Sequence, residues 1–129
     1  MSTFRKLEDI RAWGLAMRLV ERVYAKSDQD EFKYDIGLKD QIRRASVSIV
    51  SNIAEGFERE GNKEFAQFLA LAKGSAGEVL SQLYVAHQQR YIDTATFQEL
   101  RSITYQTIRM IGRLMEYLRD SPLKGRKFA

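Results

Sequence analysis

Residues 41–57, QIRRASVSIVSNIAEGF, carry the most regular pattern in the chain. With 100° of rotation per residue, one side of a helix through this stretch is apolar and carries Leu38, Ile42, Ala45, Ile49 and Ile53. The adjoining row is polar and carries Gln41, Arg44, Ser48, Asn52 and Glu55. We therefore expect a helix with one apolar and one polar neighbour, which Gly56 closes in the left-handed conformation.

The composition indicates one soluble domain. A chain of 129 residues is long enough to bury a core as a single domain, residues 1–129. It contains no Cys, which excludes disulfides and thiolate chemistry and favours a reducing compartment. The N-terminus lacks an apolar signal region, and no run of about 18 apolar residues occurs. We therefore expect a cytoplasmic protein that neither enters nor crosses a membrane.

Helical spacing of apolar residues recurs in three further stretches, and the only proline, Pro122, interrupts none of them. The four expected helices cover residues 8–26, 36–57, 62–90 and 94–119, followed by a tail over 120–129. Short links make consecutive helices antiparallel neighbours. The prediction is an all-α fold, an antiparallel up-down-up-down four-helix bundle. Gly74 and Gly77 in the third helix each cost about 1 kcal/mol relative to Ala, so we expect a neighbouring backbone close to them.

The first helix is apolar over more than half of its circumference. One face carries Ile10, Trp13, Met17, Val20 and Tyr24, and a second row carries Leu15, Leu19 and Val23. A monomer that buried only the first face would expose the second as a contiguous apolar patch, which soluble proteins rarely do. We therefore predict a homo-oligomer with Leu15, Leu19 and Val23 at the subunit interface.

The polar row of residues 41–55 is the strongest candidate for a site. Folding the third helix back places Ser75 and Glu78 opposite it, which predicts an Arg44–Glu78 ion pair and a network that fixes the register of the helices. The alternative is a pocket for a small ligand or an RNA end. The row lacks a nucleophile paired with a base, so we do not expect an enzyme.

No cofactor or metal is expected. His87 is the only histidine, and a metal site would need further ligands at helical spacing, so a partly buried packing role is favoured. Residues 56–63, GFEREGNK, lack the Gly-Lys-Ser/Thr ending of a phosphate-binding loop and the strand before it, and they predict an interhelical turn.

The charge is mildly basic. Lys and Arg number 21 against 17 acids, a formal net charge of +4, which permits an anionic partner such as RNA or DNA without requiring one. The candidate nucleic-acid contacts form two helical stripes and a tail: Arg11, Arg18 and Arg22; Arg109 and Arg113; Lys124, Arg126 and Lys127. On a monomer such groups are more often a solvated face, but a ring of subunits would repeat them on one surface.

Three motifs carry a family resemblance. Trp13 with Met17, the run QIRRASVSIVSNIAEGFER and the run FAQFLALAKGSAGE resemble the bacterial 23S rRNA-intervening-sequence proteins, once labelled S23 ribosomal proteins, over residues 4–90. The family often has Pro before the second helix and within it, where this chain has Phe32-Lys33 and Val50. The resemblance implies a four-helix bundle and a ring-shaped homo-oligomer, with a homopentamer as the expected count. It implies no established activity, and nucleic-acid binding is the usual proposal for the family.

Two main functional hypotheses follow, beside a third in which Arg44, Asn52, Glu55 and Glu78 line a small-ligand or enzymatic pocket. The first is a non-enzymatic oligomeric bundle that binds structured nucleic acid, RNA or even ribosomal RNA, through basic surfaces. The alternative is an assembly or adaptor module that recruits another protein and binds no nucleic acid.

Overall fold

The computed structural model describes residues 4–121, which form four α-helices and two short 3-10 segments. The helices are α1 (Arg11–Ser27), α2 (Ile36–Glu58), α3 (Asn62–Gln88) and α4 (Thr94–Asp120), and the 3-10 segments are η1 (Leu7–Asp9) and η2 (Phe32–Tyr34). The predicted all-α fold is confirmed, and most helix bounds agree to within two residues. The exception is the start of α1, where the backbone N–H groups of Arg5 and Lys6 donate to Asp9 and stabilise η1 instead.

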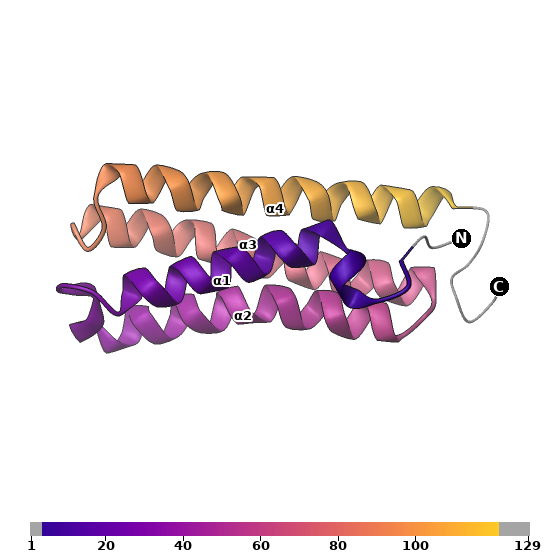
Figure 1. The fold of residues 1–129 in the computed structure, drawn as a ribbon, viewed down its shortest axis with the longest axis horizontal. Helices are drawn as coiled ribbons and strands as arrows, with labels where there is room; N and C mark the ends of the chain where they lie inside the picture. The colour runs from indigo at the N-terminus through magenta and orange to yellow at the C-terminus, as the bar shows by residue number, and fades with distance from the viewer. Residues whose placement is uncertain (1–3, 122–129) are drawn as a thin grey trace.

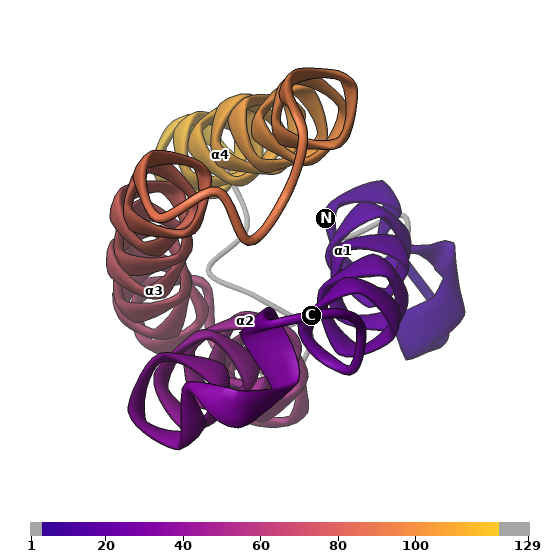
Figure 2. The ribbon, with the colours of Figure 1, turned by 90° about the vertical axis from the view of Figure 1, so that its left-hand side faces the viewer.

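The helices run along the length of the molecule, and consecutive helices are antiparallel (Figure 1). Viewed along the bundle, each helix lies beside two others, and α1 lies diagonally across from α3 (Figure 2). Helix contacts follow this order, from α1 with α2 round to α4 with α1. The first and last helices of the chain are therefore neighbours, because α4 packs against both α3 and α1.

The apolar stripe of α2 is buried as predicted. Ile42, Ile49 and Ile53 have no exposed surface, and Leu38 and Ala45 are 9% and 6% exposed. Asp35 caps the helix, because its carboxylate accepts a hydrogen bond from the backbone N–H of Leu38 at 3.1 Å. Burying one full stripe in the core of the bundle provides most of the stability of such a helix.

The two apolar rows of α1 are used in the opposite way from the prediction. Leu19 is 0% exposed and Val23 is 2% exposed within one chain, so they belong to its own core and cannot contact a second subunit. Leu15 is half-buried. The exposed row is the one expected to be inside, since Met17 and Tyr24 are each 41% exposed. Small side chains explain the reversal.

Ala12 and Ala16 lie on the buried side of α1 and are 3% and 0% exposed. Their small side chains let the helix axis approach its neighbours closely, and the flanking Leu19 and Val23 fill the space beside them. The bulky Met17 is thereby turned toward the edge of the bundle, whereas Trp13 is half-buried and packs against the core. A prediction that gives most weight to the largest apolar side chains therefore assigns the wrong face of α1 to the core.

The glycines also play roles that differ from the predictions. Gly56 lies inside α2, and a Cβ there would stand 2.8 Å from the Cβ of Phe68 and 3.2 Å from the carbonyl oxygen of Phe65. The left-handed residue after the helix is Glu60, with φ of 64°. Gly74 and Gly77 face open space, with nothing within 4 Å of an added Cβ. The close approach between helices is therefore at Gly56.

The start of α3 is tied to the end of α4. Gly61 is the N-cap of α3, not Asn62 as its residue type suggests. The side-chain amide of Asn62 donates to the carbonyl oxygen of Leu118 at 3.2 Å instead. This bond satisfies one of the carbonyls that the last turn of α4 leaves without a helical partner.

Candidate nucleic-acid interface

A short hydrogen-bonded cluster joins α2 to α3 at the centre of the polar row. The hydroxyls of Ser48 and Ser75 lie 2.9 Å apart, and the Asn52 amide donates to the Ser48 hydroxyl at 3.0 Å and to its carbonyl at 2.8 Å. Ser75 is 8% exposed, so this hydroxyl needs the partner that it has. The predicted link between these three residues is confirmed.

The rest of the predicted network does not form. Gln41, Arg44, Glu55 and Glu78 are exposed, and within residues 4–121 Arg44 and Glu78 form no ion pair. Glu55 pairs one turn along its own helix with Arg59, at 3.2 Å. Exposed partners on different helices gain little from pairing, because water competes for both charges. The hydrogen-bonded cluster therefore consists of Ser48, Asn52 and Ser75, and its role is to join α2 to α3.

Arg22 is already paired. Its guanidinium makes a two-pronged contact with the carboxylate of Glu99 on α4, at 2.9 and 2.8 Å. The hydrogen bonds from Arg22 hold the pKa of Glu99 below its ordinary value, and those to Glu99 raise the pKa of Arg22. Arg22, the last cation of the first predicted stripe, therefore joins α1 to α4 and is neutralised there.

Arg43 has a structural role that the sequence analysis missed. Its guanidinium donates to the Ser27 hydroxyl at 2.8 Å and to the Tyr24 carbonyl at 3.2 Å. It also lies 4.4 Å from the centre of the Tyr24 ring. Arg43 thereby fastens the end of α1 to α2, and the paired arginines of the QIRR motif divide into one bound and one exposed residue. Ser27 and Arg43 belong to different helices, so no spacing along a single helix indicates this contact.

Other cations gather on the surface of α4. Arg11 of α1 and Arg113 line one hollow of about 240 Å³ between α1 and α4. Arg113 also lines the next hollow, of about 610 Å³, together with Arg109 and with Lys73 of α3. One cation of the first predicted stripe, both cations of the second and Lys73 therefore form one basic surface, which we call the α4 basic surface: Arg11, Lys73, Arg109 and Arg113. Lys73 was not predicted, because its place beside α4 depends on the packing of α3.

The α4 basic surface is not neutralised by acids within residues 4–121. Among the described residues, none of its four members forms a salt bridge, and Arg18 on α1 forms none either. Glu116 lines the larger hollow and is the one acid there. Arg119 lines it too but pairs with Asp120 at 3.0 Å. The predicted contacts Lys124, Arg126 and Lys127 lie outside the described residues.

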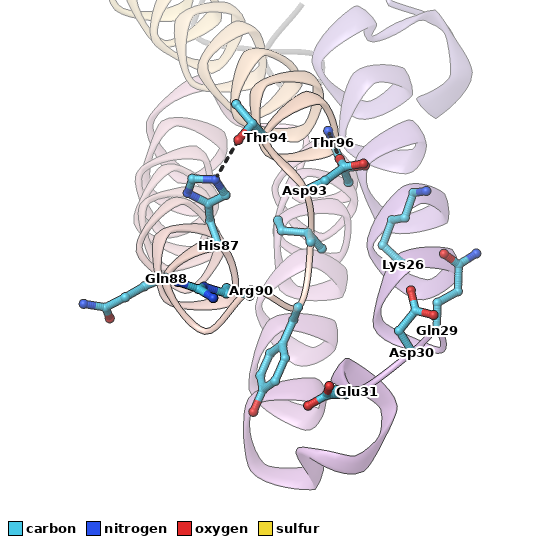
Figure 3. A pocket seen from close by; sticks show the side chains of 12 residues that line it. Lys26, Gln29, Asp30, Glu31, His87, Gln88, Arg90, Asp93, Thr94 and Thr96 are labelled. Carbon is cyan, nitrogen blue, oxygen red and sulfur yellow. Dashed lines mark hydrogen bonds between the residues drawn. The ribbon is translucent and has the colours of Figure 1, made fainter.

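A third hollow, of about 730 Å³, lies at one end of the bundle between the two connections (Figure 3). Its charged groups have both signs, with Lys26 and Arg90 near Asp30, Glu31 and Asp93. The carboxylate of Asp93 caps α4 by accepting from the backbone N–H of Thr96 at 2.8 Å, and this bond lowers its pKa. Mixed charge and groups already engaged in capping make this end a poor match for a polyanion.

His87 lies beside this end hollow and has the packing role predicted for it. Its ring stacks on Phe97 with 4.5 Å between centroids, and its Nε2 lies 3.2 Å from the Thr94 hydroxyl (Figure 3). Within residues 4–121 no group of three acidic, histidine or cysteine side chains is arranged to hold a metal ion. In the same part of the chain, no helix has the length and apolarity needed to cross a bilayer.

Comparisons with known proteins agree with this architecture. A crystal structure of a protein of unknown function from the S23 ribosomal protein family, from Bacteroides thetaiotaomicron, has a TM-score of 0.74 to this chain. It shares 17% sequence identity, and the match covers 81% of this chain and 98% of that one, which establishes a common fold. No curated protein matches the chain. The family model described as 23S rRNA-intervening sequence protein matches residues 8–113, and the chain therefore belongs to that family.

Proposed function

We propose that this chain is a non-enzymatic bundle that binds structured RNA through the α4 basic surface. The observation that carries the proposal is the convergence of four cations from three helices, none of them in a salt bridge within residues 4–121. Other arginines of the chain are engaged: Arg22 binds Glu99, and Arg43 binds Ser27 and Tyr24. Cations without an acid partner suit phosphates as ligands.

The mechanism is recognition by charge and shape. Each phosphate that a Lys or Arg neutralises releases a counterion, so affinity falls with salt and successive contacts add. Double-stranded RNA presents its phosphates on a rigid A-form helix whose deep major groove excludes side chains, and proteins read it mainly by shape. A helical face such as α4, with cations one turn apart at Arg109 and Arg113, matches that kind of target.

The test is binding to structured RNA across a salt series, with duplex DNA of equal length as comparison. The double variant Arg11→Glu with Arg113→Glu should lower RNA affinity at least tenfold, and the slope of log affinity against log salt should become shallower by about two. The matched control is Lys33→Glu with Arg44→Glu, an equal charge change at exposed positions of η2 and α2. α2 lies diagonally across from α4 (Figure 2). Equal losses in both variants, or no binding at low salt, would refute the proposal.

We also propose that the chain forms a homo-oligomer through the outward row of α1, which is the basis of the assembly alternative. Trp13 and Val20 are half-buried in this row, and Met17 and Tyr24 are each 41% exposed. A row of large apolar side chains at the edge of a bundle is typical of a contact surface. A homopentamer, as the resemblance implies, would repeat the α4 basic surface five times.

Met17→Glu tests this assembly. The substitution places a charge in the proposed contact without disturbing the core, so light scattering should report a smaller particle with unchanged helicity. Leu71→Glu, on α3 at a position that is 58% exposed, is the control and should keep the native mass. Retention of the native mass by Met17→Glu would contradict this interface. An assembly that persists while RNA never binds would favour the adaptor function.

A further inference from the structure

A row of residues one turn apart crosses the outer surface of α4: Arg101, Tyr105, Arg109 and Arg113. Each step of four residues turns by about 40° around the helix, so the row runs obliquely. It begins beside α3, where Arg101 contacts Tyr84, and it ends beside α1, where Arg113 shares a hollow with Arg11. The α4 basic surface therefore continues beyond Arg109 to another cation, with one aromatic side chain between the two.

Tyr105 is that aromatic side chain. It is 42% exposed, and among the described residues no ring or guanidinium stacks on it. Its neighbours in the row are Arg101 and Arg109, and α4 carries no acid between positions 100 and 115. An exposed phenol ring between two cations suits an unpaired nucleotide, because the ring can stack on the base while the cations bind the phosphates.

Arg101 is held in place by aromatic side chains and not by an acid. Its guanidinium lies 5.0 Å from the centre of the Phe97 ring and donates to the Tyr84 hydroxyl at 3.4 Å. Tyr84 and Phe97 meet edge to face, with 5.0 Å between their centroids. Within residues 4–121 Arg101 forms no salt bridge. A cation held against rings keeps its charge for a phosphate and loses little conformational freedom on binding one.

We propose that this row binds an unpaired nucleotide of the RNA, next to a base-paired region on the α4 basic surface. The base stacks on Tyr105, and the phosphates on either side of it bind Arg101 and Arg109. The inference rests on the proposed function and names its target more closely. A duplex alone offers no free base to Tyr105, so the preferred ligand is a duplex that continues into a single strand. Stacking tolerates any base, so the preference is for an unpaired position and not for a sequence.

Two RNA hairpins of one duplex sequence test the inference, one blunt and one with a short single-stranded extension. The extension carries 2-aminopurine, a base whose fluorescence is quenched by stacking. The native protein should bind the extended hairpin about fivefold more tightly or better, as expected for one stacked base, and should quench the probe. Tyr105→Ala should remove both the preference and the quenching, whereas Tyr105→Phe keeps the ring and should retain both.

Tyr34→Ala is the matched control, because it removes a tyrosine of η2 that is 75% exposed, and it should keep the preference. Equal affinity of the native protein for the two hairpins, or a preference that survives Tyr105→Ala, would overturn the inference and leave the proposed function standing. Loss of the preference in Tyr105→Phe would also overturn it, because the hydroxyl and not the ring would then make the contact. Binding of neither hairpin would overturn the inference and the proposed function together.

Discussion

The α2–α3 pair and the α1–α4 pair are joined in different ways. α2 and α3 are connected by three residues and meet at Gly56, where the helices approach too closely for a side chain, and at the hydroxyls of Ser48 and Ser75. α1 and α4 are distant in sequence and are joined at the surface by the Arg22–Glu99 ion pair, with Arg11 and Arg113 at a hollow further along. One junction is steric and neutral, and the other is charged and solvent-accessible.

This difference separates the part of the molecule that specifies the fold from the part that can bind a partner. A tight junction leaves no room for water or ligand, so its residues respond to changes in volume. A charged junction at the surface tolerates changes in volume and responds to salt and pH instead. Part of the α4 basic surface, Arg11 with Arg113, lies on the second kind of junction, where cations can be retained without disturbing the core.

The largest predicted effect is at the tight junction. Gly56→Ala adds a methyl group at 2.8 Å from the Cβ of Phe68 and close to the backbone of Phe65, and should destabilise the protein by about 1–3 kcal/mol. Gly74→Ala adds the same group in open space and should stabilise by up to about 1 kcal/mol through helix propensity. Chemical denaturation of the two variants measures both values. Changes of the same sign would contradict the steric account.

The next effect is the coupling between Ser48 and Ser75. Each single change to Ala removes one partner of a hydrogen bond that is partly buried, and should cost about 1 kcal/mol. The double variant should cost less than the sum, because the second change no longer leaves a hydroxyl without its partner. A double-mutant cycle by denaturation measures the coupling. Additive losses would mean that Asn52, which also donates to Ser48, is sufficient on its own.

The two junctions also differ in how far they could be predicted from the sequence. The helices and the α2 stripe were predictable from spacing along single helices. The Ser48–Asn52–Ser75 cluster was predictable because a short link folds α3 back on α2. The role of Gly56 was not, because a glycine retained for its φ angle and one retained for lack of space look alike in one sequence. The grouping of Arg11, Lys73 and Arg113 on one surface was not predictable either, because it depends on how three helices pack. The rows of α1 were reversed because small alanines, which carry little apolar weight, occupy its closest contacts.

The smallest predicted effect is on the Arg22–Glu99 ion pair of the charged junction. The pH dependence of stability gives the sign of its contribution. Because Arg22 lowers the pKa of Glu99, the ion pair stabilises the fold above the ordinary carboxyl pKa of about 4.3 and loses this contribution as pH falls through the lowered value. Glu99→Gln should therefore cost only about 0.2–1 kcal/mol at pH 7, since both side chains are about a third exposed. The stabilities of native and variant proteins should converge at more acidic pH. A difference that persists there would mean that the pair acts through packing, and the contrast between a neutral and a charged junction would fail.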